Sequence, residues 1–257
     1  MVVVVTGASG GIGRATTLAW ARRGAKLVLS ARGESALAET ARDAKAAGGE
    51  ATFEAGDVTD EAHRVHLVTK AVETFGGIDV LVNNAGRGYY AAARDVDPRE
   101  FEALFSLNVV SPLRLTQLAL PALEKARGTV VMVSSIAGVV SSPKMAAYAA
   151  SKFALEAIAI ALRAECAENG VRVLVVRPGP VDTPFRANSV AKGVEAGVRP
   201  PGAKVQAAED VAEQIVAGVA RGRAVIETTA FVSGAAFLSR VAPAVYRRVA
   251  ERMARKG

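Results

Sequence analysis

The stretch YAASKFALEAIAIALRAECAENG, from Tyr148 to Gly170, carries two reactive side chains at its start. Its run of apolar residues predicts a long helix that stops at Gly170. Tyr148 and Lys152 are four residues apart, so both side chains lie on one face of that helix. A free phenol has a pKa of about 10, and a neighbouring ammonium favours the phenolate and lowers that pKa. Such a tyrosine suits proton transfer in a carbonyl–alcohol couple.

A serine stands 13 positions before Tyr148. Ser135 ends the run TVVMVSS, residues 129–135, which predicts a strand. Its hydroxyl would orient a substrate oxygen and stabilise the charge that develops there. Ser134 is the adjacent alternative, because side chains alternate along a strand and only one of the two points into a site. Alone, Tyr148 and Lys152 are better explained as a helix start with a solvated lysine. Ser135 and the glycine loop described below favour catalysis.

The elements that must position these residues alternate along the chain. The predicted strands are 2–6, 26–31, 51–56, 79–84, 129–135, 171–179 and 224–228. The predicted helices are 11–24, 34–47, 60–75, 98–125 (with Pro112 as a possible kink), 148–169 and 210–222, followed by a helical tail. Near-continuous Val and Leu strands suit a sheet buried on both faces, and strand–helix alternation indicates parallel order. The predicted fold is α/β, with one doubly wound parallel sheet of about seven strands.

A glycine-rich stretch, VVVVTGASGGIGRA, joins the first predicted strand to the first predicted helix. Gly7, Gly11 and Gly13 permit a tight turn and let backbone N–H groups approach a diphosphate at the helix N-terminus. The strand–glycine–helix context is the one that a dinucleotide-binding loop requires, and an ordinary glycine-rich turn is the alternative. The spacing is Gly-x-x-x-Gly-x-Gly, which differs from the Gly-x-Gly-x-x-Gly of many dehydrogenases.

Seven segments together resemble the short-chain dehydrogenase/reductase family over roughly residues 1–228. They are, in order, TGASGGIG (6–13), GDVTD (56–60), NNAG (83–86), LNVVSP (107–112), VSSIAG (133–138), YAASK (148–152) and RPGPVDT (177–183). The resemblance implies a Rossmann-type fold, a nicotinamide cofactor and oxidoreductase activity. It assigns residues 1–228 to an NADP-binding and catalytic domain. Residues 229–257 lie beyond the resemblance, and their pattern predicts a helical basic C-terminal extension of that domain.

The resemblance also implies roles for single residues. Tyr148 is the general acid/base, and the positive nicotinamide ring of the oxidised cofactor would favour its phenolate. Lys152 hydrogen-bonds the nicotinamide ribose, and Asn108 holds a water that relays protons from Lys152. Without the family, Asn108 is simply a polar residue within a long helix. The full catalytic set is Asn108, Ser135, Tyr148 and Lys152.

The cofactor contacts follow from the same resemblance. Asp57 and Val58 hold the adenine, Asn84 to Gly86 pack along the adenosine, and Val181 and Thr183 meet the nicotinamide carboxamide. Without the family, NNAG predicts only a turn after a strand and RPGPVDT a simple proline turn. The expected cofactor-binding residues are Gly7, Ser9, Gly11, Ile12, Gly13, Arg32, Asp57, Val58, Asn84, Ala85, Gly86, Tyr148, Lys152, Pro178, Gly179, Val181 and Thr183.

The end of the second predicted strand favours NADP(H) over NAD(H). An acid there would bind both ribose hydroxyls of NAD and repel a 2′-phosphate, but the sequence has Arg32. Arginine offers a planar, permanently charged fork that suits phosphate. Glu34 is a possible competitor for Arg32, and Arg14 is a possible second phosphate ligand unless it points to solvent. The alternative is that Arg32 is an ordinary surface arginine after a strand.

The composition sets limits on other functions. The chain has 257 residues, 51% hydrophobic and 22% charged, with a net charge of +7 and one cysteine, Cys166. No apolar run approaches the ~20 residues of a membrane-spanning helix, and a cytoplasmic location is expected. Nucleic acid is not an expected partner, because no nucleic-acid module signature appears. His63 and His66 are expected on a solvated helix face rather than in a metal site.

The last segments depart from the family. The loop 184–207 is predicted to be a mobile lid, and its basic residues Arg186, Lys192, Arg199 and Lys204 against Glu195 leave an anionic substrate as an alternative. In the tail, Val245, Val249 and Met253 alternate with arginines, which predicts a basic amphipathic helix. That helix would cover the substrate cleft, form a subunit contact or lie on an anionic membrane.

The sequence therefore predicts an NADP(H)-dependent oxidoreductase that acts on a small-molecule carbonyl or secondary alcohol. The alternative is an NADP(H)-binding sensor or scaffold without turnover, and the catalytic set argues against it because a sensor needs no proton relay. A homodimer or homotetramer is expected by resemblance, with the helices at 98–125 and 148–169 at the interface.

Overall fold

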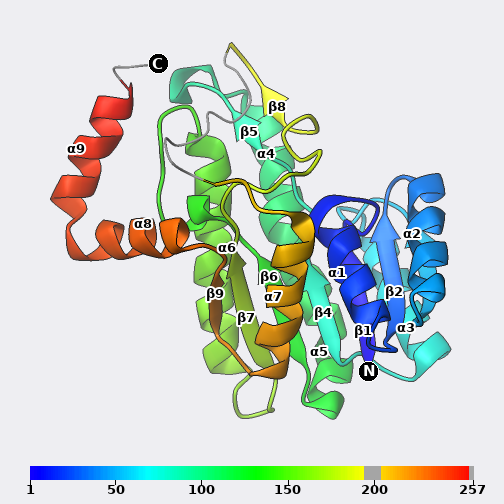
Figure 1. Ribbon diagram of the computed structural model, residues 1–257. Helices are drawn as coiled ribbons and strands as arrows, with labels where there is room; N and C mark the ends of the chain where they lie inside the picture. Colours follow the sequence, from blue (N-terminus) through cyan, green and yellow to red (C-terminus); the bar gives the residue numbers. More distant parts are fainter. Residues whose placement is uncertain (194–203, 255–257) are drawn as a thin grey trace.

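The protein is described here by a computed structural model that covers residues 1–193 and 204–254. Seven strands form one parallel sheet in the order β3-β2-β1-β4-β6-β7-β9 (Figure 1). They are β1 (Val2–Thr6), β2 (Lys26–Ala31), β3 (Glu50–Ala55), β4 (Val80–Asn83), β6 (Thr129–Val133), β7 (Arg172–Arg177) and β9 (Val225–Glu227). The predicted α/β class with a parallel sheet is confirmed.

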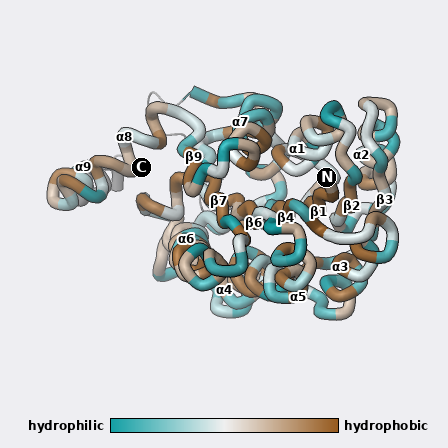
Figure 2. The backbone as a smooth tube through the Cα atoms, turned by 90° about the horizontal axis from the view of Figure 1, so that it is seen from below, coloured by the Kyte–Doolittle hydropathy of each residue, from teal (hydrophilic) through white to brown (hydrophobic). Residues whose placement is uncertain are grey.

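Helices cover both faces of this sheet. They are α1 (Gly11–Ala21), α2 (Glu34–Ala46), α3 (Glu61–Phe75), α4 (Pro98–Phe105), α5 (Ser111–Ala126), α6 (Ala146–Glu165) and α7 (Ala208–Ala220). Figure 2 shows α1, α2 and α7 on one side and α3, α4, α5 and α6 on the other. Val3 and Val5 of β1 pack into the first layer and Val4 into the second, which is why the strand is apolar at every position.

The strand order creates a switch point. From β1 the sheet grows outward through β2 and β3 on one side and through β4, β6, β7 and β9 on the other. The loops that leave β1 and β4 therefore diverge, and open α/β sheets bind ligands in the crevice that results.

The predicted single helix over 98–125 is wrong in one respect. A π-helical turn, Ser106–Val110, separates α4 from α5, and the backbone N–H of Ser111 bonds to the carbonyl of Ser106. The irregularity precedes Pro112, which lacks the N–H that an α-helix would pair with the carbonyl of Asn108. The proline predicted as a kink thus coincides with a widened turn that carries Asn108.

Other boundaries differ by a few residues. Helix α6 begins at Ala146, so Tyr148 lies in its first turn. It ends at Glu165 rather than near Gly170, because the next residues form a tight turn. In that turn, Gly170 N–H bonds to the carbonyl of Ala167 and Val171 N–H to that of Cys166. Gly170 has a φ of 78°, which suits glycine.

A second, two-stranded sheet was not expected. It pairs β5 (Tyr89–Tyr90) in parallel with β8 (Val190–Ala191) and connects the segment after β4 to the predicted lid. Glu195 and Arg199 of that lid lie outside the described residues. The tail forms α8 (Ala230–Val241) and α9 (Pro243–Ala254), which are separated by Ala242. Figure 1 shows this arm extending away from the sheet.

The expectation that both histidines are solvated is wrong for His63. Its side chain is 7% exposed, and its Nε2 lies 2.8 Å from the hydroxyl of Ser30. His66 is exposed. Because Gly56 packs directly against the His63 ring, the histidine serves to hold β2, β3 and α3 together.

One helical stretch, Pro98–Ala126, is long and apolar enough to cross a membrane by length and composition alone, contrary to the prediction. In this structure 44% of its most apolar window is buried inside the protein. It packs against α3 and the sheet, so its apolar residues are those of a core helix.

Candidate active site

A cavity of about 1430 Å³ lies at the carboxyl ends of the sheet strands. Its wall includes residues from the ends of six strands, namely Gly7, Ala31, Gly56, Asn84, Ser134 and Pro178. Of the residues predicted from the sequence as catalytic or cofactor-binding, all except Gly13 and Asn108 line it. The volume exceeds the roughly 300–1,000 Å³ of a typical ligand pocket, so a dinucleotide and a substrate can share it.

Tyr148 lines the cavity and is 6% exposed. Burial raises the pKa of its phenol, although a hydrogen bond with the Ser135 hydroxyl acts in the opposite direction. The lowered pKa expected from the sequence is therefore wrong for the protein by itself, because desolvation of the phenolate outweighs the neighbouring groups. The phenol is protonated at neutral pH, which is the form that can donate a proton to a carbonyl oxygen.

Lys152 lies one turn further along α6 and is 4% exposed. Its Nζ donates to the carbonyl of Val133 at 2.9 Å and lies 5.9 Å from the centre of the Tyr148 ring. Burial lowers the pKa of Lys152 to about 8, and the Glu156 carboxylate acts in the opposite direction. Beside the phenol there is thus an amine that can gain or lose a proton near neutral pH.

The structure distinguishes the two adjacent serines. Ser135 precedes a short 3₁₀ turn, and its Oγ accepts a hydrogen bond from the N–H of Ala137 at 3.1 Å. It is also the serine that interacts with Tyr148. Ser134 is 4% exposed, and its Oγ has no hydrogen-bond partner within residues 1–193 and 204–254. A Cβ placed on Gly138 would lie 2.5 Å from that oxygen, so Ser134 points under the 3₁₀ turn.

Asn108 is brought near the catalytic group but does not line the cavity. Its Oδ1 accepts from the N–H of Arg87 at 3.0 Å, and its Nδ2 donates to the carbonyl of Arg87 at 3.0 Å and to the Ser151 hydroxyl at 3.1 Å. The side chain therefore fixes the segment after β4 against α6. Its main-chain carbonyl is the group that Pro112 leaves without an α-helical donor.

The glycine loop is suited to a diphosphate. Helix α1 begins after Gly10 without a side-chain cap, so its first N–H groups are available to an anion. No atom lies within 4 Å of the position that a Gly10 Cβ would occupy. Gly13 has a different task, because a Cβ there would lie 2.1 Å from the carbonyl oxygen of Gly7. Gly13 thus allows α1 to approach the end of β1 closely.

The far end of the cavity contains Arg32 and Asp57. Arg32 is exposed and forms no ion pair within the described part of the chain, so Glu34 does not compete for it there. Arg14 instead pairs with Asp43 at 2.6 Å and does not line the cavity. Burial opposes ionisation of Asp57, but hydrogen bonds from Thr59 and the charge of Arg32 outweigh it and lower the pKa of Asp57.

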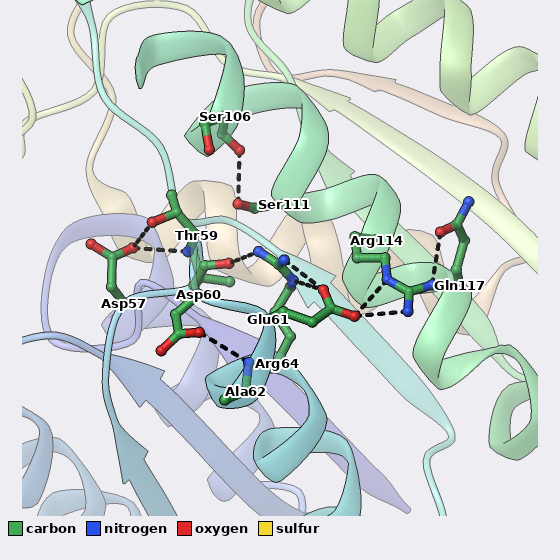
Figure 3. A network of polar contacts seen from close by, with 11 residues as sticks. Asp57, Thr59, Asp60, Glu61, Ala62, Arg64, Ser106, Ser111, Arg114 and Gln117 are labelled. Carbon is green, nitrogen blue, oxygen red and sulfur yellow. Dashed lines mark hydrogen bonds and ion pairs between the residues drawn. The ribbon is translucent and has the colours of Figure 1, made fainter. Parts of the chain in front are cut away.

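A polar network that the sequence analysis missed supports this end (Figure 3). Buried Arg64 donates to the carbonyl of Val58 at 2.6 Å and pairs with Glu61 at 2.6 Å. Glu61 also pairs with Arg114 of α5 at 2.7 Å. The network fixes the backbone of Val58, which lines the cavity. An isolated arginine in a helix pattern gives no sign that its side chain turns back to a strand end.

Proline-containing backbone forms the cavity wall beyond β7. The carbonyl of Pro178 accepts from the N–H of Ile136 at 2.9 Å, which connects this segment to the turn after Ser135. Thr183 packs against Gly11, whose Cβ would lie 3.1 Å from the threonine Cγ2. Val181 forms a bridge with Gln206. These contacts place Pro178, Gly179, Val181 and Thr183 opposite the glycine loop.

Aromatic residues that the sequence analysis did not assign surround Tyr148. The Tyr90 ring lies 6.4 Å and the Phe185 ring 5.9 Å from that of Tyr148, measured between ring centres. Tyr246 of α9 also lines the cavity, and its hydroxyl donates to the carbonyl of Ser141. The adjacent tyrosines at 89 and 90 were the available signal, but nothing in the sequence paired them with residues 100 positions away.

Comparisons with known proteins agree with this geometry. A family model described as short chain dehydrogenase matches residues 1–193. Dehydrogenase/reductase SDR family member 7B of Mus musculus is 34% identical over 263 residues, covering 99% of this chain and 81% of the mouse protein.

Two solved structures show the same fold with different cofactors. An alcohol dehydrogenase from the archaeon Thermococcus sibiricus, complexed with 5-hydroxy-NADP, aligns with a TM-score of 0.73 and 30% identity, covering 83% of this chain and 88% of that one. A short chain dehydrogenase from Mycobacterium paratuberculosis bound to NAD aligns with a TM-score of 0.77 and 27% identity, covering 87% and 94%. A nicotinamide cofactor is supported.

Proposed function

The chain belongs to the short-chain dehydrogenase family, and from that premise we propose that it is an NADP(H)-dependent oxidoreductase acting on a carbonyl or secondary alcohol. One observation carries the proposal: Ser135, Tyr148 and Lys152 meet in the wall of a cavity that extends to an uncapped glycine loop. That arrangement joins proton-transfer groups to a diphosphate cradle.

Each residue of the catalytic group would have its own role in the reaction. The bound cofactor supplies or accepts a hydride at its nicotinamide ring. Tyr148 donates a proton to the carbonyl oxygen in reduction and accepts one from the alcohol in oxidation. Ser135 donates a hydrogen bond to the same oxygen and stabilises its developing charge. Lys152 places a positive charge beside the phenol and lines the cavity, where its ammonium would donate to a ribose of the cofactor.

NADP(H) is favoured by the charge at the far end of the cavity. Arg32 lines the cavity there and is not neutralised by a carboxylate ion pair among residues 1–193 and 204–254. A 2′-phosphate would supply the missing anion. Arg14 is removed from this role by its pairing with Asp43.

The assembly and location of the protein are also proposals. Val110, Phe153 and Ile160 are 53%, 44% and 61% exposed on the face formed by the π-helical turn and α6, which supports a dimer through these helices. Since Tyr246 lines the cavity, we favour the cleft-covering role for the C-terminal arm. Membrane contact by that arm and a cytoplasmic location stay predictions.

The test is the oxidation of NADPH, followed at ~340 nm, with a panel of ketones and aldehydes. We expect Tyr148→Phe to lower kcat by about 10²–10⁴-fold while NADPH still binds. Tyr89→Phe is the matched control, because Tyr89 is also buried but does not line the cavity, and its hydroxyl accepts from the N–H of Asp97 at 3.1 Å.

The outcomes separate the candidate functions. Loss of turnover in Tyr148→Phe but not in Tyr89→Phe supports the oxidoreductase. NADPH binding without turnover of any carbonyl would support the sensor. Absence of NADPH binding would contradict the assignment of the glycine loop and Arg32.

A further inference from the structure

The end of the cavity near Tyr148, called the substrate end, is lined by positively charged side chains. Asp57 is the acidic residue that lines the cavity within the described ranges, and it lies at the far end beside Arg32. Near Tyr148 the charged residues of the wall are Arg87, Lys144, Lys152 and Arg186. A neutral substrate has no need of this arrangement, whereas an anionic substrate would be attracted by it.

Arg186 is the cation of this group that is best placed to bind a ligand. Arg87 already pairs with Glu100 at 2.7 Å. No carboxylate of the described residues lies within ion-pair distance of Arg186, which is only partly exposed. Arginine rarely lines a pocket beside aromatic rings without an acidic partner, because desolvation of its charge is then uncompensated.

The local structure holds Arg186 near the reacting group. The preceding residue, Phe185, packs against the Tyr148 ring. The Ser189 hydroxyl donates to the carbonyl of Phe185 at 2.7 Å and accepts from the N–H of Gly88 at 3.2 Å, which ties this loop to the β5–β8 sheet. Tyr90 also lies close enough to interact with Arg186: burial raises the pKa of the Tyr90 phenol, and the charge of Arg186 acts in the opposite direction.

Apolar side chains also line this end of the cavity. Three separate segments supply its wall, with the side chains Val140, Met145, Phe185, Phe231, Leu238 and Tyr246. Phe231 and Leu238 come from α8 and Tyr246 from α9, so the C-terminal arm provides one side. A hydrocarbon chain would bury apolar surface against these residues.

We propose that the substrate is an amphipathic carbonyl compound, with an alkyl chain along the arm and a carboxylate or phosphate bound by Arg186. The inference rests on the proposed function, since the carbonyl is assigned to Tyr148 and Ser135. Arginine binds either anion through paired hydrogen bonds, so both are named.

Binding of non-reducible probes tests the proposal apart from turnover. Dodecanoate, dodecyl phosphate and dodecanol share one chain and differ only in the head group. We expect calorimetry with the NADPH-loaded protein to show that both anions bind at least about tenfold more tightly than dodecanol. Arg186→Gln should remove that difference and Arg186→Lys should restore part of it. The two anion arms decide between carboxylate and phosphate.

A turnover series provides the second measurement. With a mid-chain oxododecanoate and its methyl ester, the ratio of the two kcat/KM values should favour the acid and approach one in Arg186→Gln. Arg94→Gln is the matched control, because the Arg94 side chain is 89% exposed and does not line the cavity.

Two results would overturn the proposal. One is equal affinity for dodecanol and both anions, and the other is an equal acid-to-ester ratio in the protein and Arg186→Gln. If carbonyls are reduced without regard to the head group, the oxidoreductase stands and this inference falls. If no carbonyl is reduced, the oxidoreductase falls and the binding series still decides whether Arg186 is an anion site. Melting temperatures of each variant identify any that fails to fold.

Discussion

At the scale of single residues, the catalytic group depends on burial. Tyr148 and Lys152 are both nearly excluded from water, and burial shifts their pKa values in opposite directions. The Tyr148 phenol keeps its proton, and the pKa of Lys152 is brought near physiological pH. The protonated phenol is the form that carbonyl reduction requires. The lowered pKa of Lys152 allows that side chain to gain or lose its charge near neutral pH.

The cofactor preference is a prediction about Arg32. Replacing it with alanine removes the unpaired guanidinium and should raise KM for NADPH by about 10- to 100-fold while KM for NADH stays nearly constant. Steady-state kinetics with both cofactors checks this. Arg14→Ala is the control, because Arg14 is occupied by Asp43. Equal changes for the two cofactors would show that Arg32 does not bind the 2′-phosphate.

The buried ammonium of Lys152 predicts a pH dependence of stability. Between pH 8 and 10.5 the unfolded chain holds this proton and the folded protein does not, so this group makes stability rise with pH. The difference between the pKa of 10.5 and about 8 corresponds to about 3 kcal/mol. The free energy of unfolding of the protein should therefore rise by about that amount relative to Lys152→Met across this window. Urea denaturation at both ends checks it, and parallel pH curves would contradict it.

At the scale of elements, α6 is held against the sheet by a buried ion pair. Arg177 of β7 donates to both carboxylate oxygens of Glu156, at 3.0 and 2.8 Å, and to Glu227 of β9 at 3.0 Å. Glu156 lies one turn after Lys152, and its charge partly offsets the lowering of that lysine's pKa by burial. The Glu156 carboxylate thus both holds α6 against the sheet and affects the pKa of the catalytic lysine.

Breaking this pair should be costly. Arg177→Met leaves Glu156 buried without its partner and should lower the free energy of unfolding by about 3–5 kcal/mol. Arg23→Met is the control, since Arg23 and Glu213 are 45% and 43% exposed and such surface pairs contribute less than about 1 kcal/mol. Chemical denaturation compares the two variants. Similar small losses for both would show that the buried pair does not anchor α6.

At the scale of the whole molecule, apolar surface remains on α6. Phe153 and Ile160 are seven residues apart and therefore share one helix face, beside Val110 of the π-helical turn. Single exposed apolar residues are ordinary, but three on one face favour a protein contact. The helix that carries the catalytic group would then also carry the interface.

The corresponding prediction concerns self-association. Ile160→Asp puts a charge into the proposed interface and should weaken the dimer by about 30-fold or more, in line with ~2 kcal/mol for a central contact. Sedimentation velocity over a concentration series measures this. Phe237→Asp on α8 is the control, because Phe237 is 66% exposed but lies on the C-terminal arm. Dissociation by the control and not by Ile160→Asp would place the interface on the arm.

The sequence by itself determined the parallel sheet, the order of most elements and a set of site residues most of which line the cavity. Those features depend on local patterns: continuous apolar runs in the strands, glycines at one turn, and a four-residue spacing on one helix. The pairing of β5 with β8, the burial of His63, the π-helical turn around Asn108 and the Arg177–Glu156 contact were decided only by the tertiary structure. Each of these features either joins segments that are distant in the chain or depends on the balance between desolvation of a polar side chain and its interactions with neighbouring groups. No local sequence pattern reports either effect.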